Sequence, residues 1–185
     1  MRRFFMLAVA LTSAALSSFG CDSDDSGGSN NGGSGGAPLA HCVGINSEFT
    51  PADFYAQAAD DKACSSSSDL TSICANDLPR IGGMCGASCV TMSADAAGRA
   101  ACNAECINDA LTSAKAKPLS DECMACYTAD IECAAANCLG ECATAPASVE
   151  CATCRVTKGC VAAFYGCSGL PIPTSPSGNG GEGGA

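Results

Sequence analysis

The sequence is short of the large side chains from which hydrophobic cores are built. Its 185 residues include no tryptophan, six phenylalanines and three tyrosines, and much of its hydrophobic content of 47% is alanine and cysteine. Buried apolar surface stabilises a fold by about 25 cal/mol per Å², and alanine-rich helices bury little of it per residue. We therefore expect a source of stability other than a large core.

Positive charge and histidine are also scarce. Nine lysines and arginines stand against nineteen aspartates and glutamates, which gives a formal net charge of −10. Such an acidic surface repels nucleic acid, so no nucleic-acid partner is expected. The single histidine, His41, excludes most Cys–His and Ser–His–Asp schemes, and no Walker, Rossmann or zinc-protease motif occurs. We expect neither an enzyme nor a cofactor.

Cysteine, in contrast, is abundant. The chain holds seventeen cysteines, a content that in an exported protein indicates a disulfide scaffold. Each native bridge in a small exported domain contributes about 2–4 kcal/mol. Disulfides can therefore supply the stability that the small apolar side chains do not.

The N-terminal end has the pattern of an export signal. Two arginines precede an apolar run from Phe4 to Leu16, which is too short to span a bilayer. The residues S-S-F-G then lead to Cys21, and small residues before a cysteine resemble the bacterial lipobox, in which that cysteine is acylated. Without Cys21 an even number of cysteines, sixteen, remains. We expect a signal peptide over 1–20 and lipidation at Cys21; the alternative is an ordinary secretory signal.

Composition divides the rest of the chain into three parts. Residues 21–37 are rich in Gly, Ser and Asp and predict a flexible tether between the lipid and the body. Residues 38–170 hold the remaining sixteen cysteines and predict a helical domain. Residues 171–185 hold prolines and then glycines and predict a disordered tail.

Two cysteine pairs predict a stapled helical hairpin. Cys85 and Cys89 are one helical turn apart, and twelve residues later Cys102 and Cys106 repeat that spacing. Side chains four residues apart lie on one face of a helix. Two such helices in antiparallel contact would pair Cys85 with Cys106 and Cys89 with Cys102.

Cap signals predict the other helices before Pro118. Thr50-Pro51-Ala52-Asp53 begins a helix expected to reach Cys64, with Phe54 and Ala58 on its inner side. A short helix is expected over 69–75. Pro79 opens the helix of Cys85 and Cys89.

Ser93 is expected to cap a helix over 94–115. On this helix the cysteine face lies opposite the face of Ile107 and Leu111. A neighbour is therefore needed on both sides, which favours an array of helices.

An approximate repeat begins at Ser120. Both copies start with S-x-E-C-x-x-C and continue to C-x-A-A, and a further one-turn pair of cysteines lies between them. The sequence does not fix the pairing of these cysteines. The cysteines expected to form structural disulfides are Cys42, Cys64, Cys74, Cys85, Cys89, Cys102, Cys106, Cys123, Cys126, Cys133, Cys138, Cys142, Cys151, Cys154, Cys160 and Cys167.

Two resemblances follow from these motifs. The Cys-x3-Cys pairs over 85–106 resemble the twin Cys-x3-Cys helical hairpins of plant hairpin peptides and mitochondrial intermembrane-space proteins. Residues 1–170 resemble the cysteine-rich predicted lipoproteins of myxobacteria and their relatives, in the Gly-Cys signal end, the Gly/Ser tether and a segment like G-C-V-A-A-F-Y-G-C-S-G over 159–169. The second resemblance implies a surface location and no established activity.

Together these patterns predict an all-α, disulfide-stapled array of short helices in a lipoprotein of the cell surface or envelope. Its N-terminal acyl chains would bind the membrane, and its role would be structural or binding; the sequence does not identify its ligand, an extracellular protein or a glycan. The alternative is storage of Cu(I) or another soft metal on thiolates. A redox enzyme using Cys123-x-x-Cys126 or Cys151-x-x-Cys154 would require a β-rich fold, and no strand pattern is visible.

Overall fold

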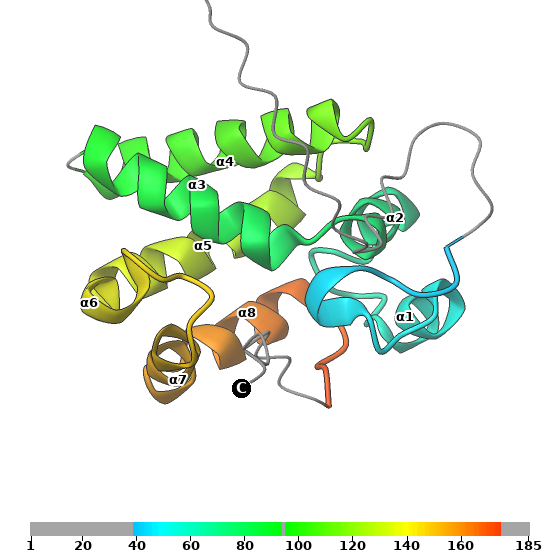
Figure 1. The fold of residues 1–185 in the computed structure, drawn as a ribbon. Coiled ribbons are helices and arrows are strands. Elements are labelled where there is room, and N and C mark those ends of the chain that lie inside the picture. The colour runs from blue at the N-terminus through cyan, green and yellow to red at the C-terminus, as the bar shows by residue number, and fades with distance from the viewer. Residues whose placement is uncertain (1–38, 94, 175–185) are drawn as a thin grey trace, which may run out of the picture. The chain divides into compact units, whose positions relative to one another are not determined.

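The computed structural model describes residues 39–93 and 95–174, which contain helices and no strand. The elements are a 3₁₀ turn η1 (Gly44–Asn46) and the helices α1 (Pro51–Gln57), α2 (Ser67–Ala75), α3 (Leu78–Met92), α4 (Ala96–Ser113), α5 (Asp121–Asn137), α6 (Leu139–Cys142), α7 (Val149–Thr157) and α8 (Cys160–Ser168) (Figure 1). An all-α array of short disulfide-linked helices is therefore confirmed. The predicted signal peptide, tether and Cys21 lie outside the described residues.

Helices α3 and α4 form an antiparallel hairpin, which lies along one side of α5 in Figure 1. Disulfides join Cys85 to Cys106 and Cys89 to Cys102, the nested order that the spacing predicts. Across α4 from these bridges, Ile107 and Leu111 are fully buried. Helix α4 thus has the two neighbours expected from its opposite faces, α3 and α5.

A second and longer series of nested disulfides joins the two copies of the repeat. Its bridges are Cys126–Cys167, Cys133–Cys160, Cys138–Cys154 and Cys142–Cys151. Each bridge lies inside the previous one along the chain, as in the α3–α4 hairpin. The first two hold α8 against α5, and the last two hold the α6 region against α7.

The two copies of the repeat fold differently despite their shared motif. Ser120 and Ser148 both cap their helices by accepting the N–H of the first cysteine of the copy, Cys123 or Cys151. Helix α5 then continues for 17 residues. The second copy is broken at Gly159, whose φ of +79° is left-handed and favours glycine. The break makes α7 and α8 separate helices that both contact α5.

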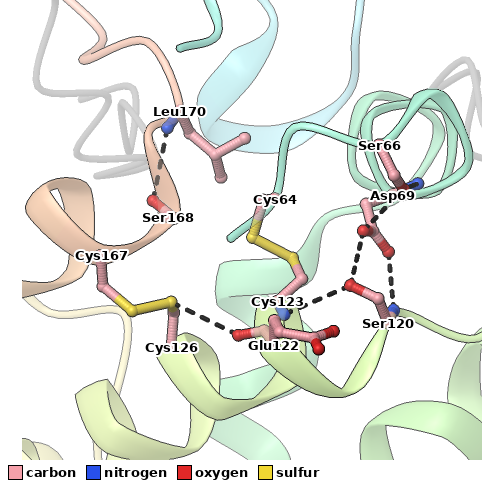
Figure 2. The surroundings of a disulfide bond; sticks show 10 residues. All are labelled: Cys64, Ser66, Asp69, Ser120, Glu122, Cys123, Cys126, Cys167, Ser168 and Leu170. Atoms are coloured by element: carbon pink, nitrogen blue, oxygen red, sulfur yellow. Dashed lines mark hydrogen bonds between the residues drawn. A yellow bond between two sulfur atoms is a disulfide. The ribbon is translucent and has the colours of Figure 1, made fainter. Parts of the chain in front are cut away.

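The first two helices are fixed to α5 by the Cys64–Cys123 bridge, whose two residues are fully buried (Figure 2). Cys42 is joined to Cys74 on α2. The segment before α1 is thereby fixed to α2, and α1 also packs on α2.

The expectation that the first helix reaches Cys64 was wrong. Helix α1 ends at Gln57, and Ala58 is extended. The N–H groups of Ala59, Ala63 and Cys64 instead donate to carbonyls at 167–169, the end of α8. Hydrogen bonds to the end of α8 therefore take the place of the helical hydrogen bonds that residues 58–64 would otherwise form. Phe54 is fully buried, as expected.

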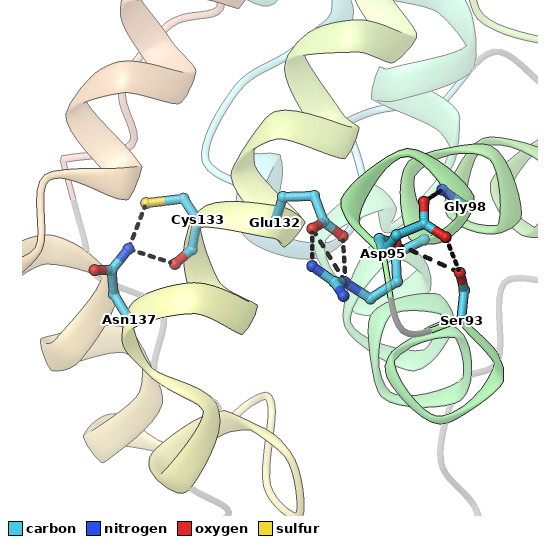
Figure 3. Close-up of polar contacts among 7 residues, drawn as sticks. Ser93, Asp95, Gly98, Glu132, Cys133 and Asn137 are labelled. Carbon is cyan, nitrogen blue, oxygen red and sulfur yellow. Dashed lines mark hydrogen bonds and ion pairs between the residues drawn. The ribbon is translucent and has the colours of Figure 1, made fainter.

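The cap of α4 also differs from the expectation. Asp95 accepts the Gly98 N–H through Oδ1 at 2.7 Å, whereas Ser93 ends α3 and its hydroxyl contacts Asp95 (Figure 3). The hydrogen bond from Gly98 holds the pKa of Asp95 below its usual value. The helix therefore begins at Ala96. Arg99 on its first turn forms a two-pronged ion pair with Glu132 on α5.

Sulfur makes up much of the interior. Ten of the twenty-one buried hydrophobic residues in the described part of the chain are half-cystines. Phe54, Ile73, Leu78, Ile107 and Leu111 are the largest side chains that are fully buried. None of the helices in the described ranges combines the length and the apolar character that a membrane crossing requires.

The chain beyond α8 stays on the domain over its described residues. Leu170 and Pro171 are buried. Thr174 donates to both carboxylate oxygens of Glu48, from its N–H at 2.6 Å and its hydroxyl at 2.9 Å. The first four residues of the predicted disordered tail, 171–174, are thus held in place, and the others lie outside the described residues.

Candidate functional site

A groove of about 750 Å³ lies between α3, α5, the α6–α7 segment and α8. Its volume falls in the range of about 300–1,000 Å³ that is usual for ligand sites. Most of its lining is aliphatic or aromatic, and the described end of the chain contributes Ile172 and Pro173. We refer to this feature as the groove.

Small residues line the groove on two facing helices. Helix α3 contributes Gly82, Gly83, Gly86 and Ala87, and α5 contributes Ala134 and Ala135. The glycines also permit close approach of other segments to α3. A Cβ atom on Gly86 would lie 2.8 Å from Cγ2 of Ile131, and one on Gly83 would lie 3.1 Å from Cβ of Pro146.

Three aromatic residues form one wall of the groove. The rings of Tyr127 and Phe164 are 4.9 Å apart between centroids, and those of Phe164 and Tyr165 are 5.3 Å apart, both edge to face. Burial raises the pKa of Tyr165 to about 12 and raises that of Tyr127 further. A tyrosine is protonated at neutral pH even without such a shift, and the shift makes both phenols still weaker acids, which suits contact with an apolar ligand better than acid–base chemistry.

One ion pair lies among these apolar residues. Arg155 Nη2 on α7 donates to Asp130 Oδ2 on α5 at 2.5 Å. The other carboxylate oxygen, Oδ1, is buried and has no hydrogen-bond partner. Burial raises the pKa of Asp130, although the positive charge of Arg155 acts in the opposite direction. The pair is the groove's only charged element among the described residues that line it.

Exposed apolar side chains gather at the rim of the groove. Leu139, Val149, Val156 and Ile172 all line it and are 47–65% exposed. They are half of the eight large hydrophobic side chains that are exposed in the described part of the chain. Solvated apolar residues that gather beside a concave surface are typical of a binding site.

The cysteines of the described residues are all bonded in pairs and offer no free thiol in this structure. Each of the sixteen cysteines expected to be structural is bonded to another. Only the Cys142–Cys151 bridge lines the groove. Over residues 39–93 and 95–174 no three potential ligands are grouped in a way that could hold a metal ion. The copper-storage alternative requires thiolates, and these residues offer none.

The single histidine and the glutamates that directly precede a cysteine do not line the groove. His41 is exposed near the start of the described chain. Of the five glutamates that precede a cysteine, four are exposed, and Glu132 pairs with Arg99. Asp130, Arg155 and Tyr127 were not singled out from the sequence, whereas Phe164 and Tyr165 lie in the quoted segment over 159–169 but were given no role in a site. The glycines and alanine at positions 82, 83, 86 and 87 are a candidate sequence signal for the groove, but such small residues on a helix mark close packing just as well.

Comparison of the chain with protein-family models, with curated proteins and with solved structures finds no match. The functional argument therefore depends on the groove itself. Its apolar lining, exposed rim and single ion pair are suited to binding an apolar molecule that carries one polar group.

Proposed function

We propose that this chain is an exported, lipid-anchored binding protein whose disulfide-stapled helices hold an apolar ligand in the groove without catalysing a reaction. The observation that carries this proposal is the groove, because four of the exposed large apolar side chains lie on its rim. Eight disulfides support export, since bridges persist in oxidising compartments. The apolar run before Cys21 supports acylation of that residue and attachment to the cell envelope.

Rigid walls suit such a role. Two bridges hold α3 to α4, and four more hold α8 and α7 to α5 and α6. A site whose walls are already in place loses less conformational entropy when the ligand binds. The disulfides would thus serve binding as well as stability.

Binding can be tested with the oxidised, delipidated protein and the fluorescent probe N-phenyl-1-naphthylamine. We expect saturable binding that weakens at least about tenfold in Ala134→Phe, where a ring occupies the groove. The matched control is Ala125→Phe, because Ala125 is exposed on the same helix and does not line the groove. Equal binding by both variants, or no binding by the parent protein, would refute the proposal.

The anchor requires a separate test. Alkylation of the unreduced, denatured protein followed by intact-mass analysis should label none of the sixteen body cysteines and should show an acyl mass on an N-terminal Cys21. A Cys21→Ser variant should leave the membrane fraction. An unmodified Cys21 would refute the lipid anchor, and extensive thiol labelling would favour the metal-storage alternative.

A further inference from the structure

The ion pair in the groove has unused hydrogen-bonding capacity. Asp130 Oδ2 accepts from Arg155, while Oδ1 is buried without a partner. A guanidinium carries five N–H donors, and the only hydrogen bond of Arg155 within the described chain uses Nη2. Buried polar atoms are nearly always hydrogen-bonded, so an orphan acceptor beside a ligand-sized cavity requires an explanation. A ligand group that donates to Asp130 and accepts from Arg155 would use both the unpaired oxygen Oδ1 and the remaining N–H donors of the guanidinium.

The charges around the pair restrict that group further. A carboxylate would meet the Asp130 oxygen and a chain whose formal net charge is −10. An ammonium would meet the guanidinium of Arg155, which already occupies the other oxygen of Asp130. The two lining charges cancel, so a neutral polar group is the best electrostatic match. A hydroxyl is the simplest neutral group that both donates and accepts.

We propose that the ligand of the groove is an uncharged amphiphile, with an apolar chain against the aliphatic and aromatic walls and a hydroxyl at the Asp130–Arg155 pair. This inference rests on the proposed function, because it names the ligand class of the same groove. The Arg155 side chain is 26% exposed and that of Asp130 is 12% exposed. Because Oδ1 is itself buried, the hydroxyl reaches it by displacing a neighbouring side chain, and Arg155 is the more exposed member of the pair.

The test compares ligands that differ only in their polar end. A long-chain primary alcohol, the carboxylate and the primary ammonium of the same chain length compete with bound N-phenyl-1-naphthylamine at neutral pH. The alcohol should bind about tenfold or more tightly than either ion, because an ion brings an uncompensated charge into the groove, whereas the hydroxyl can hydrogen-bond to both members of the pair. Lengthening the alcohol should tighten its binding about fourfold per methylene.

A double variant tests the role of the pair directly. Asp130→Leu with Arg155→Met replaces the ion pair with apolar side chains, a change that folded proteins often tolerate. In this variant the binding of the alcohol should weaken about tenfold or more, because both hydrogen-bond partners of its hydroxyl are gone. Glu132→Leu with Arg99→Met is the matched control, since it removes the other ion pair of α5 outside the groove and should leave the affinity for the alcohol unchanged.

The outcomes separate the two proposals. Probe binding that Ala134→Phe weakens, together with equal or tighter binding of the carboxylate or the ammonium, would overturn the hydroxyl assignment and leave the groove as a binding site. Unchanged affinity of the double variant for the alcohol would also overturn it. Failure of every amphiphile and of the probe to bind would instead refute the proposed function.

Discussion

Asp69 on α2 accepts both hydrogen bonds that Ser120, the cap of α5, can donate. The Ser120 N–H reaches Asp69 Oδ1 and its hydroxyl reaches Oδ2, each at 2.7 Å (Figure 2). Asp69 also accepts from the hydroxyl of Ser66, the cap of its own helix. One buried carboxylate thus joins the N-terminal caps of α2 and α5, although Asp69 and Ser120 are 51 residues apart in the sequence.

Replacing Asp69 with Asn should therefore lower the free energy of unfolding by about 1–3 kcal/mol, because a buried charged acceptor of three hydrogen bonds is lost. Urea-induced unfolding followed by circular dichroism measures the change. Asp53→Asn is the matched control, since Asp53 exchanges the same pair of bonds with Thr50 but is exposed and has no distant partner. Its effect should stay within about 0.5 kcal/mol. Equal losses in the two variants would contradict a special role for the link to α5.

The Cys64–Cys123 bridge also joins the region of α2 to the start of α5, and it should be among the most stabilising of the eight disulfides. Its sequence separation is 59, whereas that of Cys142–Cys151 is 9. Loop-closure entropy predicts about 4 kcal/mol for a long loop and about 2.5 kcal/mol for a short one. Thermal unfolding of the two paired Cys→Ala variants should therefore show the larger loss for Cys64–Cys123. A larger loss for Cys142–Cys151 would show that loop length does not set the order in this fold.

The sequence predicted the local parts of this fold well. The spacing of Cys85, Cys89, Cys102 and Cys106 was sufficient to pair them because both helices of that hairpin have regular periodicity. Pairing the cysteines of the repeat in the same nested order would also have been correct. Such a prediction requires knowing that the helix of the second copy breaks at Gly159. A glycine within an otherwise helical pattern marks such a break only weakly.

Tertiary contacts decided what the sequence could not. The segment 58–64 has helical composition, yet its N–H groups bond to the end of α8, more than a hundred residues later. The groove was not predictable for the same reason: Asp130 and Arg155 are 25 residues apart and meet only because disulfides set the register of α5 against α7 and α8. No local pattern marks either residue as part of a site.

Two glycines of α3 allow a test of packing beside the groove. A Cβ atom on Gly82 would make an ordinary contact of 3.5 Å with Ile131, while one on Gly86 would lie 2.8 Å from the stiff Cγ2 branch of the same residue. Gly82→Ala should stabilise the protein by about 0.5–1 kcal/mol through helix propensity. Gly86→Ala should be destabilising by about 1–2 kcal/mol, because overpacking outweighs that gain. Chemical denaturation compares the two, and stabilisation by Gly86→Ala would show that Ile131 can move away.

The raised pKa of Asp130 predicts a specific dependence of stability on pH. Between the pKa of an unfolded aspartate, about 3.9, and the higher pKa in the fold, the folded protein binds more protons than the unfolded chain. The contribution of Asp130 to the free energy of unfolding therefore falls as pH rises through this window, by about 1.4 kcal/mol for each unit of the shift. Below this pH window Asp130 is protonated in both the folded and the unfolded state, so the cost of burying its charge is absent.

Asp130→Asn has no such titration, so its melting temperature should rise relative to that of the parent protein between about pH 4 and neutral pH. Glu132→Gln controls for the loss of one negative charge from the same helix. Differential scanning calorimetry across this range measures both differences. If the melting temperature of the parent protein instead rises relative to that of Asp130→Asn as pH increases, the attraction of Asp130 to Arg155 exceeds the cost of burying the carboxylate. The groove would then hold a strong structural ion pair, and its orphan oxygen would not be the weak point at which a ligand binds.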